Sequence, residues 1–123
     1  MATAGKLDLY IEQGALFQRT FQCRAEDGFT PVDLNGWTAD GEMRRKTSIT
    51  SSIPMNVSIN GPTLGIIQWY MTDEETAAIP TDPQAGPERQ PTLYTYDVEL
   101  TDPSGQTFRV LEGIIEVSPE ATR

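Results

Sequence analysis

The sequence predicts an all-β protein built from two packed antiparallel sheets, and three observations lead to this prediction. Turn-forming Gly, Pro, Asn and Asp interrupt short apolar runs roughly every ten residues. Helix signals are confined to one short segment late in the chain. The clearest strand lies near the C-terminus, where polar residues separate four apolar residues that share one face: Tyr94, Tyr96, Val98 and Leu100.

A hairpin follows this strand. Residues 102–105, Asp-Pro-Ser-Gly, have the composition of a type I turn, and Gly105 suits the left-handed residue of a bulged three-residue loop. The hydrophobic pattern then selects one register, with three cross-strand pairs: Leu100 with Phe108, Glu99 with Arg109, and Val98 with Val110. Apolar residues change parity after this point, so we expect a second irregularity near residues 112–113.

Earlier apolar runs predict strands near residues 7–11, 17–24, 37–43, 55–59 and 64–71. In the run at 64–71, Ile67, Trp69 and Met71 form the better inward row. Thr72 and Glu75 have the spacing of a capping box, which predicts a short helix over about residues 72–79. About seven antiparallel strands with one short helix before the last hairpin indicate an immunoglobulin-like β-sandwich.

The chain length fits a single domain over residues 1–123, in which residues 80–91 form an exposed, proline-rich loop. A net charge of −9 argues against nucleic acid and anionic membranes as partners. One cysteine excludes an internal disulfide, and no leader or membrane-spanning run is present in this sequence. We therefore expect the chain to fold in a reducing cytoplasm.

Residue types that support catalysis are scarce. Histidine is absent, and Cys23 falls on an inward strand position where a thiol is usually inert. Asp97, Glu99 and Asp102 on one strand, with Glu112 and Glu116 on the next, could form a hydrolase pair or a calcium site. Solvated strand faces are commonly acidic, however, and Glu99 faces Arg109. We therefore expect no enzymatic activity, no cofactor and no bound metal.

Candidate contact residues come from three features. The only basic cluster, Arg44–Lys46, either docks an acidic partner or forms a charged edge that blocks strand pairing. Two semi-exposed apolar strips and the proline-rich loop are the other features. The predicted protein-interface residues are Arg44, Arg45, Lys46, Ile66, Tyr70, Pro83, Pro87, Arg89 and Phe108. Trp37 and Trp69 fit the core better than a carbohydrate platform.

Several segments resemble one family. These segments are IEQGALF, VDLNGWTADGEMRRK, MTDEETAAIP and YDVELTDPSG, followed by LEGIIEVSPEATR. Together they resemble the small immunoglobulin-like structural proteins of tailed bacteriophages, associated with the tail, baseplate or fibre region. The resemblance implies a non-enzymatic virion component, assembled in the host cytoplasm, that contacts other virion structural proteins in multiple symmetric copies. A capsid decoration (cement) protein and a glycan- or receptor-binding module are the alternatives.

Overall fold

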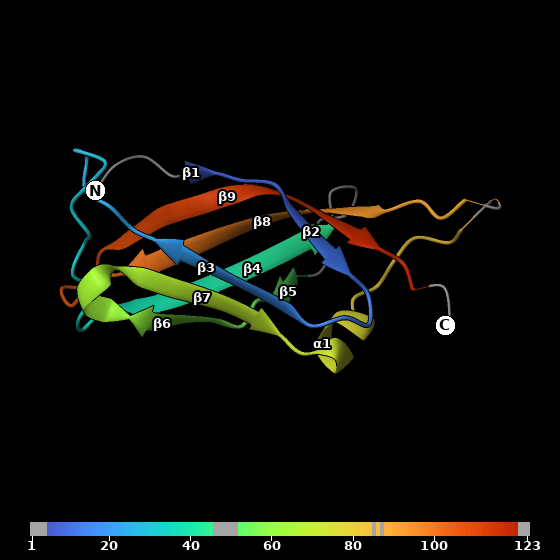
Figure 1. The fold of residues 1–123 in the computed structure, drawn as a ribbon, viewed down its shortest axis with the longest axis horizontal. Helices are drawn as coiled ribbons and strands as arrows, with labels where there is room; N and C mark the ends of the chain where they lie inside the picture. The colour runs from blue at the N-terminus through green and yellow to red at the C-terminus, as the bar shows by residue number, and fades with distance from the viewer. Residues whose placement is uncertain (1–4, 46–51, 85, 87, 121–123) are drawn as a thin grey trace.

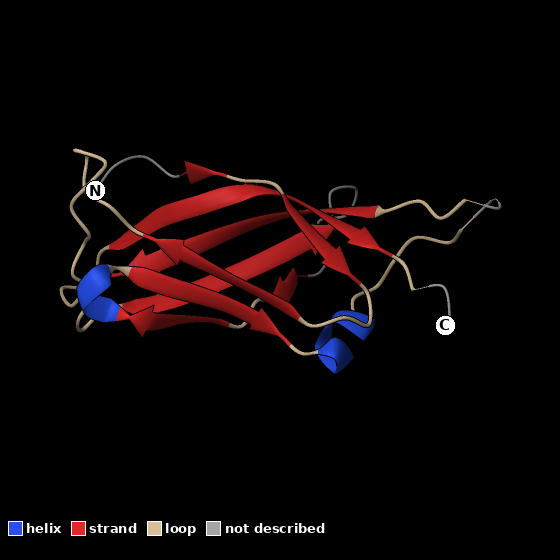
Figure 2. Ribbon diagram, in the orientation of Figure 1, coloured by secondary structure: helices blue, strands red, loops and turns tan. Residues whose placement is uncertain are grey.

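The computed structural model describes residues 5–45, 52–84, 86 and 88–120, which form two β-sheets packed face to face (Figure 1). The larger sheet contains β1 (Gly5–Lys6), β2 (Leu9–Glu12), β4 (Thr38–Arg45), β5 (Ser52–Pro54), β8 (Thr92–Thr101) and β9 (Thr107–Ser118). The smaller sheet contains β3 (Phe17–Gln22), β6 (Val57–Gly61) and β7 (Ile66–Met71). Two short helices, η1 (Pro62–Leu64) and α1 (Asp73–Ala77), lie at opposite ends of the sandwich (Figure 2).

The strand order is that of an immunoglobulin-like sandwich, as the sequence predicts. The larger sheet runs β1-β9-β8-β4-β5 with β2 also on β9, and the smaller sheet runs β3-β7-β6. In immunoglobulin terms β4, β8 and β9 take the places of strands C, F and G, β5 follows C in the same sheet, and the smaller sheet supplies B, E and D.

The N-terminal segment differs from the expected antiparallel strand. Within the described residues it forms two short strands, and both pair with β9 in parallel. Gly113 makes room for this segment, since a Cβ there would stand 2.1 Å from the carbonyl oxygen of Leu7. Because Gly113 has no side chain, the backbone at Leu7 approaches β9 closely and donates a hydrogen bond of 3.0 Å to Glu112 O.

The last hairpin has the expected turn but a bulge in a different place. Gly105 has φ +93° and its N–H donates to Asp102 O. Leu100 lies opposite Phe108 and Glu99 opposite Arg109, as predicted. The predicted Val98–Val110 pair is wrong, because the register shifts there and Val98 lies opposite Leu111. This shift accounts for the change of parity that the sequence placed near residues 112–113.

An aromatic cluster joins the two sheets. Trp69 on β7 is fully buried, packs edge-on against Phe17 of β3 at 4.9 Å between ring centroids, and lies 5.5 Å from Tyr96 of β8. The inward row predicted for β7 is confirmed. These rings occupy the space between the sheets. The chain has one cysteine, Cys23, and burial raises the pKa of its thiol.

The capping box of α1 is present as predicted. The Thr72 hydroxyl accepts from Glu75 N, and the Glu75 carboxylate accepts from Thr72 N. Behind the helix, Ile79 is buried against the core. Thr76, also buried, accepts from Gly14 N and donates to Ala15 O, so α1 is fastened to the β2–β3 turn. The helix thereby fixes the point from which the proline-rich loop leaves the sandwich.

Candidate assembly surfaces

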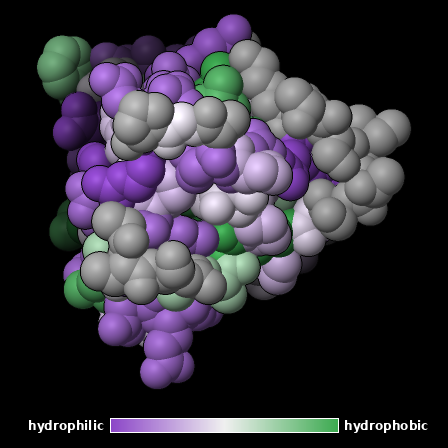
Figure 3. Space-filling model, turned by 90° about the vertical axis from the view of Figure 1, so that its right-hand side faces the viewer, coloured by the Kyte–Doolittle hydropathy of each residue, from purple (hydrophilic) through white to green (hydrophobic). Residues whose placement is uncertain are grey.

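A proline-rich protrusion leaves one end of the sandwich between α1 and β8 (Figure 1). We call residues 82–91 the arm. Its described residues, 82–84, 86 and 88–91, are all exposed. Figure 3 views the molecule from this end, where the described surface is mostly hydrophilic and apolar residues appear only in small, separate areas. The described surface at this end therefore presents no broad apolar area, and the arm extends away from the sheets there (Figure 1).

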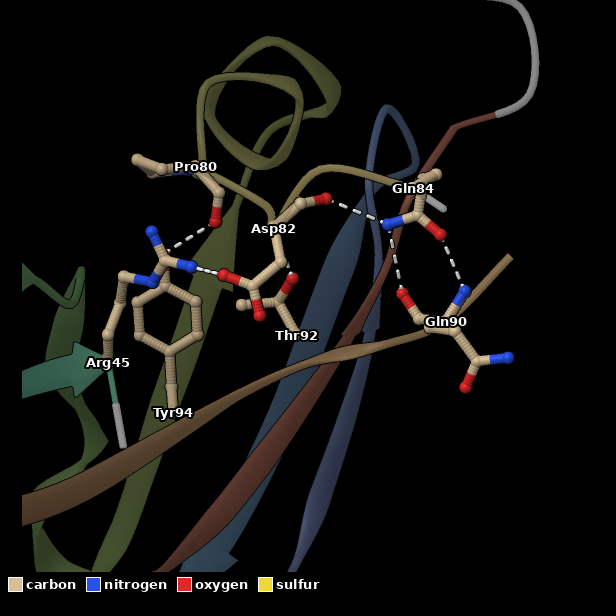
Figure 4. Close-up of polar contacts among 7 residues, drawn as sticks. All are labelled: Arg45, Pro80, Asp82, Gln84, Gln90, Thr92 and Tyr94. Carbon is tan, nitrogen blue, oxygen red and sulfur yellow. Dashed lines mark hydrogen bonds and ion pairs between the residues drawn. The ribbon is translucent and has the colours of Figure 1, made fainter. Parts of the chain in front are cut away.

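Hydrogen bonds to β8 and an ion pair to β4 hold the base of the arm (Figure 4). The buried Tyr94 hydroxyl donates to Pro80 O at 2.6 Å, as in the tyrosine corner of immunoglobulin domains. Asp82 N donates to the Thr92 hydroxyl oxygen at 2.7 Å. The Arg45 guanidinium, at the end of β4, pairs with the Asp82 carboxylate. The arm thus starts from a position fixed by the larger sheet.

A glutamine side chain closes the arm above this base (Figure 4). Gln84 Nε2 donates to Asp82 O at 2.8 Å and to Gln90 O at 3.2 Å. In return, Gln84 Oε1 accepts from Gln90 N at 2.6 Å. The amide therefore acts toward Gln90 as a neighbouring strand would, satisfying one backbone donor and one backbone acceptor. The outgoing and returning halves of the arm are held together.

Electrostatics support this arrangement. Burial raises the pKa of Tyr94, an effect that the nearby Arg45 charge partly opposes. The phenol therefore remains a neutral hydrogen-bond donor at physiological pH. On the returning half, Arg89 Nη1 donates to Pro119 O at 3.1 Å, which links the arm to the chain after β9.

Arg44 and Arg45 of the predicted basic cluster have different partners. Arg45 belongs to the base of the arm, whereas Arg44 is exposed and lies 3.6 Å from the Glu42 carboxylate. Lys46 and Pro87 lie outside the described residues. Pro83 and Arg89 are exposed on the arm. Of the predicted contact residues, the structure therefore brings Arg45, Pro83 and Arg89 to the same end of the molecule.

The predicted apolar strip on the smaller sheet is interrupted by polar side chains. Tyr70 pairs with Gln18 on β3, and Ile66 pairs with Gln22. Between them lies Gln68. Tyr70 is 36 % exposed and Ile66 is half-buried. This face presents separate apolar groups rather than one continuous patch, so it offers little area for a hydrophobic contact.

Phe108, the remaining predicted residue, lies at the other end of the sandwich, near Trp37. The two rings are 5.9 Å apart with an interplanar angle of 34°. They contribute to a groove of about 580 Å³, which we call the aromatic groove; its lining residues are Ala25, Glu26, Asp27, Val32, Trp37, Asp102 and Phe108. Trp37, expected in the core, packs against the core cluster of Leu34, Ile67 and Leu100 but is only half-buried, whereas Trp69 is fully buried.

Of the carboxylates considered for catalysis or calcium, Asp102 lies in the last hairpin turn and the others lie on the two last strands of the larger sheet. Arg109 is within 3.8 Å of Asp97 and 3.4 Å of Glu112, so the guanidinium lies between these two carboxylates, and Glu99 is its partner only in the strand register. Among the described residues, no three metal-binding side chains are grouped to hold an ion. Within the same residues, no helix combines the length and apolarity needed to cross a bilayer.

Sequence reasoning missed most of the arm's supports: Gln84, Gln90, Thr92 and the hydroxyl of Tyr94. The alternating pattern correctly predicts that the Tyr94 ring lies in the core. It does not predict that the Tyr94 hydroxyl donates to the Pro80 carbonyl. A tyrosine at the start of the strand after the helix is the usable signal, because this is the position of the tyrosine corner.

Comparisons with known proteins give structural likeness alone. No family model and no curated protein matches the sequence. Among solved structures, AggA, the major subunit of aggregative adherence fimbriae type I from Escherichia coli, is similar with a TM-score of 0.40 and 8 % identity, over 92 % of this chain and 89 % of that one. Murine CRIg is similar with a TM-score of 0.35 and 14 % identity, over 92 % of each chain. Likeness at this level carries no argument about function.

Proposed function

We propose that this protein is a non-enzymatic structural component of a tailed bacteriophage virion, in the tail, baseplate or fibre-attachment apparatus. A sequence resemblance and a structural feature support this proposal. The sequence motifs from IEQGALF to VSPEATR resemble phage structural proteins. The fold presents an arm that suits a contact between proteins. Its partners are other virion structural proteins, present with it in multiple symmetric copies.

The observation that carries the assembly role is the way in which the arm is clamped. Tyr94, Thr92 and Arg45 hold its base, and Gln84 joins its two halves. Backbone that is already held in the free protein, as at residues 82–84 and 89–90, loses less conformational entropy on binding, so more of the contact energy appears as affinity. Proline adds to this effect because its φ angle is fixed.

The test is made on purified phage particles. Mass spectrometry is expected to find the chain in stoichiometric amounts, and cryo-EM is expected to show its sandwich in the tail, baseplate or fibre region. Density on the capsid would instead identify a decoration protein. Absence of the chain from intact particles would contradict the proposal in either form.

The arm's part in assembly needs a separate variant. Replacing residues 83–90 with a glycine-serine segment of equal length is expected to remove the protein from particles while leaving its thermal unfolding nearly unchanged. A matched control changes Gln18 and Thr20, exposed on the smaller sheet, to serine and is expected to incorporate normally. Normal incorporation of the arm variant would show that another surface makes the contact.

A further inference from the structure

The aromatic groove lies between two connections at the end of the sandwich opposite the arm. One wall comes from the β3–β4 connection, with Ala25, Val32 and Trp37. The other comes from the last hairpin, with Phe108. These residues give the groove an apolar lining. Its volume of about 580 Å³ is large enough for one large side chain with its flanking backbone.

Backbone contacts fix the shape of the groove. Val32 N donates to Cys23 O at 3.0 Å, and Cys23 N donates to Gly65 O at 2.8 Å. Gly65 itself has φ +70°, and a Cβ there would lie 2.6 Å from Cys23 O. Against the other side, Pro103 of the hairpin turn approaches Gly36 so closely that a Cβ would lie 3.2 Å from Pro103 Cγ. The β3–β4 connection, η1 and the hairpin therefore form one packed unit.

The rim of the groove is negatively charged. Of the residues that line it, Glu26, Asp27 and Asp102 are acidic and none is basic. Hydrogen bonds from the Thr30 side chain and from nearby backbone amides lower the pKa of Asp27 to about 2. The Ser104 hydroxyl and the backbone N–H of Gln106 lower the pKa of Asp102 in the same way. Both carboxylates are therefore charged over the whole physiological range.

The nearest cation on this connection is directed elsewhere. Arg24 donates from Nε to the Gln22 side chain and from Nη1 to Gly28 O. It does not line the groove. The rim charge therefore remains open to a ligand, and the net charge of −9 adds a long-range attraction for cations.

We propose that the aromatic groove binds a basic segment of a partner protein, in which an apolar side chain is flanked by arginine or lysine. The apolar side chain would pack on Trp37 and Phe108, and the flanking cations would face the rim carboxylates and the aromatic ring faces. This proposal extends the assembly role, but it concerns the end opposite the arm. Failure of binding here would therefore leave the test on particles unaffected.

A neutral glycan fits the groove less well. Carboxylate oxygens contribute to sugar recognition when they are free to accept hydrogen bonds from sugar hydroxyl groups. Asp27 Oδ1 already accepts from Phe29 N and Thr30 N, and its Oδ2 accepts from the Thr30 hydroxyl. Asp102 Oδ1 accepts three hydrogen bonds within its own turn. These carboxylates supply fixed charge, which favours a cation.

The experiment uses the full chain and three fluorescein-labelled nonapeptides with one central tryptophan. The tryptophan is flanked by arginines in the first peptide, by serines in the second and by glutamates in the third. Fluorescence anisotropy is expected to show binding of the arginine peptide at least tenfold tighter than of the serine peptide. Binding should weaken with added salt, and the glutamate peptide should not bind.

Two charge-reversal variants distinguish binding at the groove from non-specific electrostatic attraction to an acidic protein. Glu26→Arg, on the exposed rim, is expected to weaken the arginine peptide at least tenfold. Glu74→Arg, exposed on α1 at the arm end, changes the net charge equally and is expected to change affinity less than twofold. Phe108→Leu is expected to weaken the peptide several-fold, and thermal unfolding verifies that this variant folds.

Three outcomes would overturn the proposal. The first is no binding of the arginine peptide at millimolar concentration. The second is an equal loss from Glu26→Arg and Glu74→Arg, which would show attraction without a site. The third is a shift of the Trp37 indole NMR signal with a neutral oligosaccharide such as chitotriose but not with the arginine peptide, which would indicate a glycan site instead.

Discussion

The two ends of this sandwich are stabilised by different parts of the chain. At the groove end, the β3–β4 connection and η1 are held by backbone hydrogen bonds, and glycines allow the close approaches. At the arm end, side chains do the holding, through Tyr94, Thr92, Arg45 and Gln84. The contact between the β3–β4 connection and η1 therefore depends on backbone conformation, although the Asp27 and Asp102 side chains hydrogen-bond within their own turns. The arm end can be loosened one side chain at a time.

The largest expected effect concerns Gly65, at the groove end. Gly65→Ala places a methyl group 2.6 Å from Cys23 O and 2.8 Å from Val32 O, at a residue with φ +70°. Cys23 O accepts the hydrogen bond from Val32 N and cannot move away without weakening it. We therefore expect a loss of about 3–5 kcal/mol in the free energy of unfolding. Urea denaturation measures this loss.

Gly28 provides the matched control. It also has positive φ, +78°, but nothing lies within 4 Å of its added Cβ. Gly28→Ala therefore carries only the conformational strain and is expected to cost about 1–2 kcal/mol. Equal losses for the two variants would mean that the close packing of the groove end adds nothing, and the contrast between the ends would fail.

A second effect concerns alkaline pH. Tyr96 donates from its hydroxyl to Leu7 O at 2.6 Å, and burial, with a smaller contribution from the Asp8 charge, raises its pKa to about 12. The unfolded phenol ionises near pH 10. The resulting stability is therefore complete below pH 10 and is lost as the pH rises from about 10 to 12, up to about 2–3 kcal/mol.

Chemical denaturation at pH 9, 10 and 11 measures the first part of this loss. Tyr96→Phe is expected to flatten the dependence substantially, leaving the smaller contribution of Tyr94, whose pKa burial also raises. A wild-type protein with constant stability up to pH 11 would contradict the assignment. The result would also show how firmly the N-terminal segment, which belongs to neither end, is held.

A third effect is specific to the arm. Tyr94→Phe removes the hydrogen bond to Pro80 O and is expected to cost about 1–2 kcal/mol. Hydrogen exchange is the sharper measurement: the Asp82 and Gln90 amides, which bond to Thr92 and Gln84, should exchange faster. In Tyr96→Phe, where a comparable bond is lost elsewhere, these two amides should keep their protection. If both variants leave the arm unchanged, Tyr94 does not support it.

Features with local signals in the sequence were predicted well. Alternation identified the inward rows of β7 and β8, because a strand exposes alternate side chains to one environment. The capping box located α1, because its two hydrogen bonds join residues three apart. The turn at residues 102–105 followed from Asp, Pro and Gly, each of which favours its own turn position.

Features that depend on distant parts of the chain were not predicted. The parallel pairing of β2 with β9 joins opposite ends of the sequence, and the Tyr96–Leu7 bond spans 89 residues. The bulge between Val98 and Glu99 has no glycine to mark it. The two candidate surfaces also depend on residues far apart in the sequence. The contacts that hold the arm and the lining of the aromatic groove each combine residues from separate parts of the chain. Trp37 is an example. The alternating pattern predicts that its side chain points inward, but not that it lies at the open end of the sandwich and is only half-buried.

The smallest expected effect concerns the ion pair at the base of the arm. Arg45→Gln removes the partner of Asp82, and because this pair is partly exposed we expect less than about 1 kcal/mol of lost stability. Local order should respond more clearly, because the pair joins the first residue of the arm to β4. Trypsin cleavage after Arg89, an exposed arm residue, should accelerate several-fold. Arg44→Gln, which alters only the exposed contact with Glu42, is the control and should leave this cleavage rate unchanged. Equal cleavage rates in both variants would mean that Tyr94, Thr92 and Gln84 hold the arm without the ion pair. Faster cleavage in Arg45→Gln alone would show that a surface ion pair can order the arm even though it adds little to the free energy of unfolding.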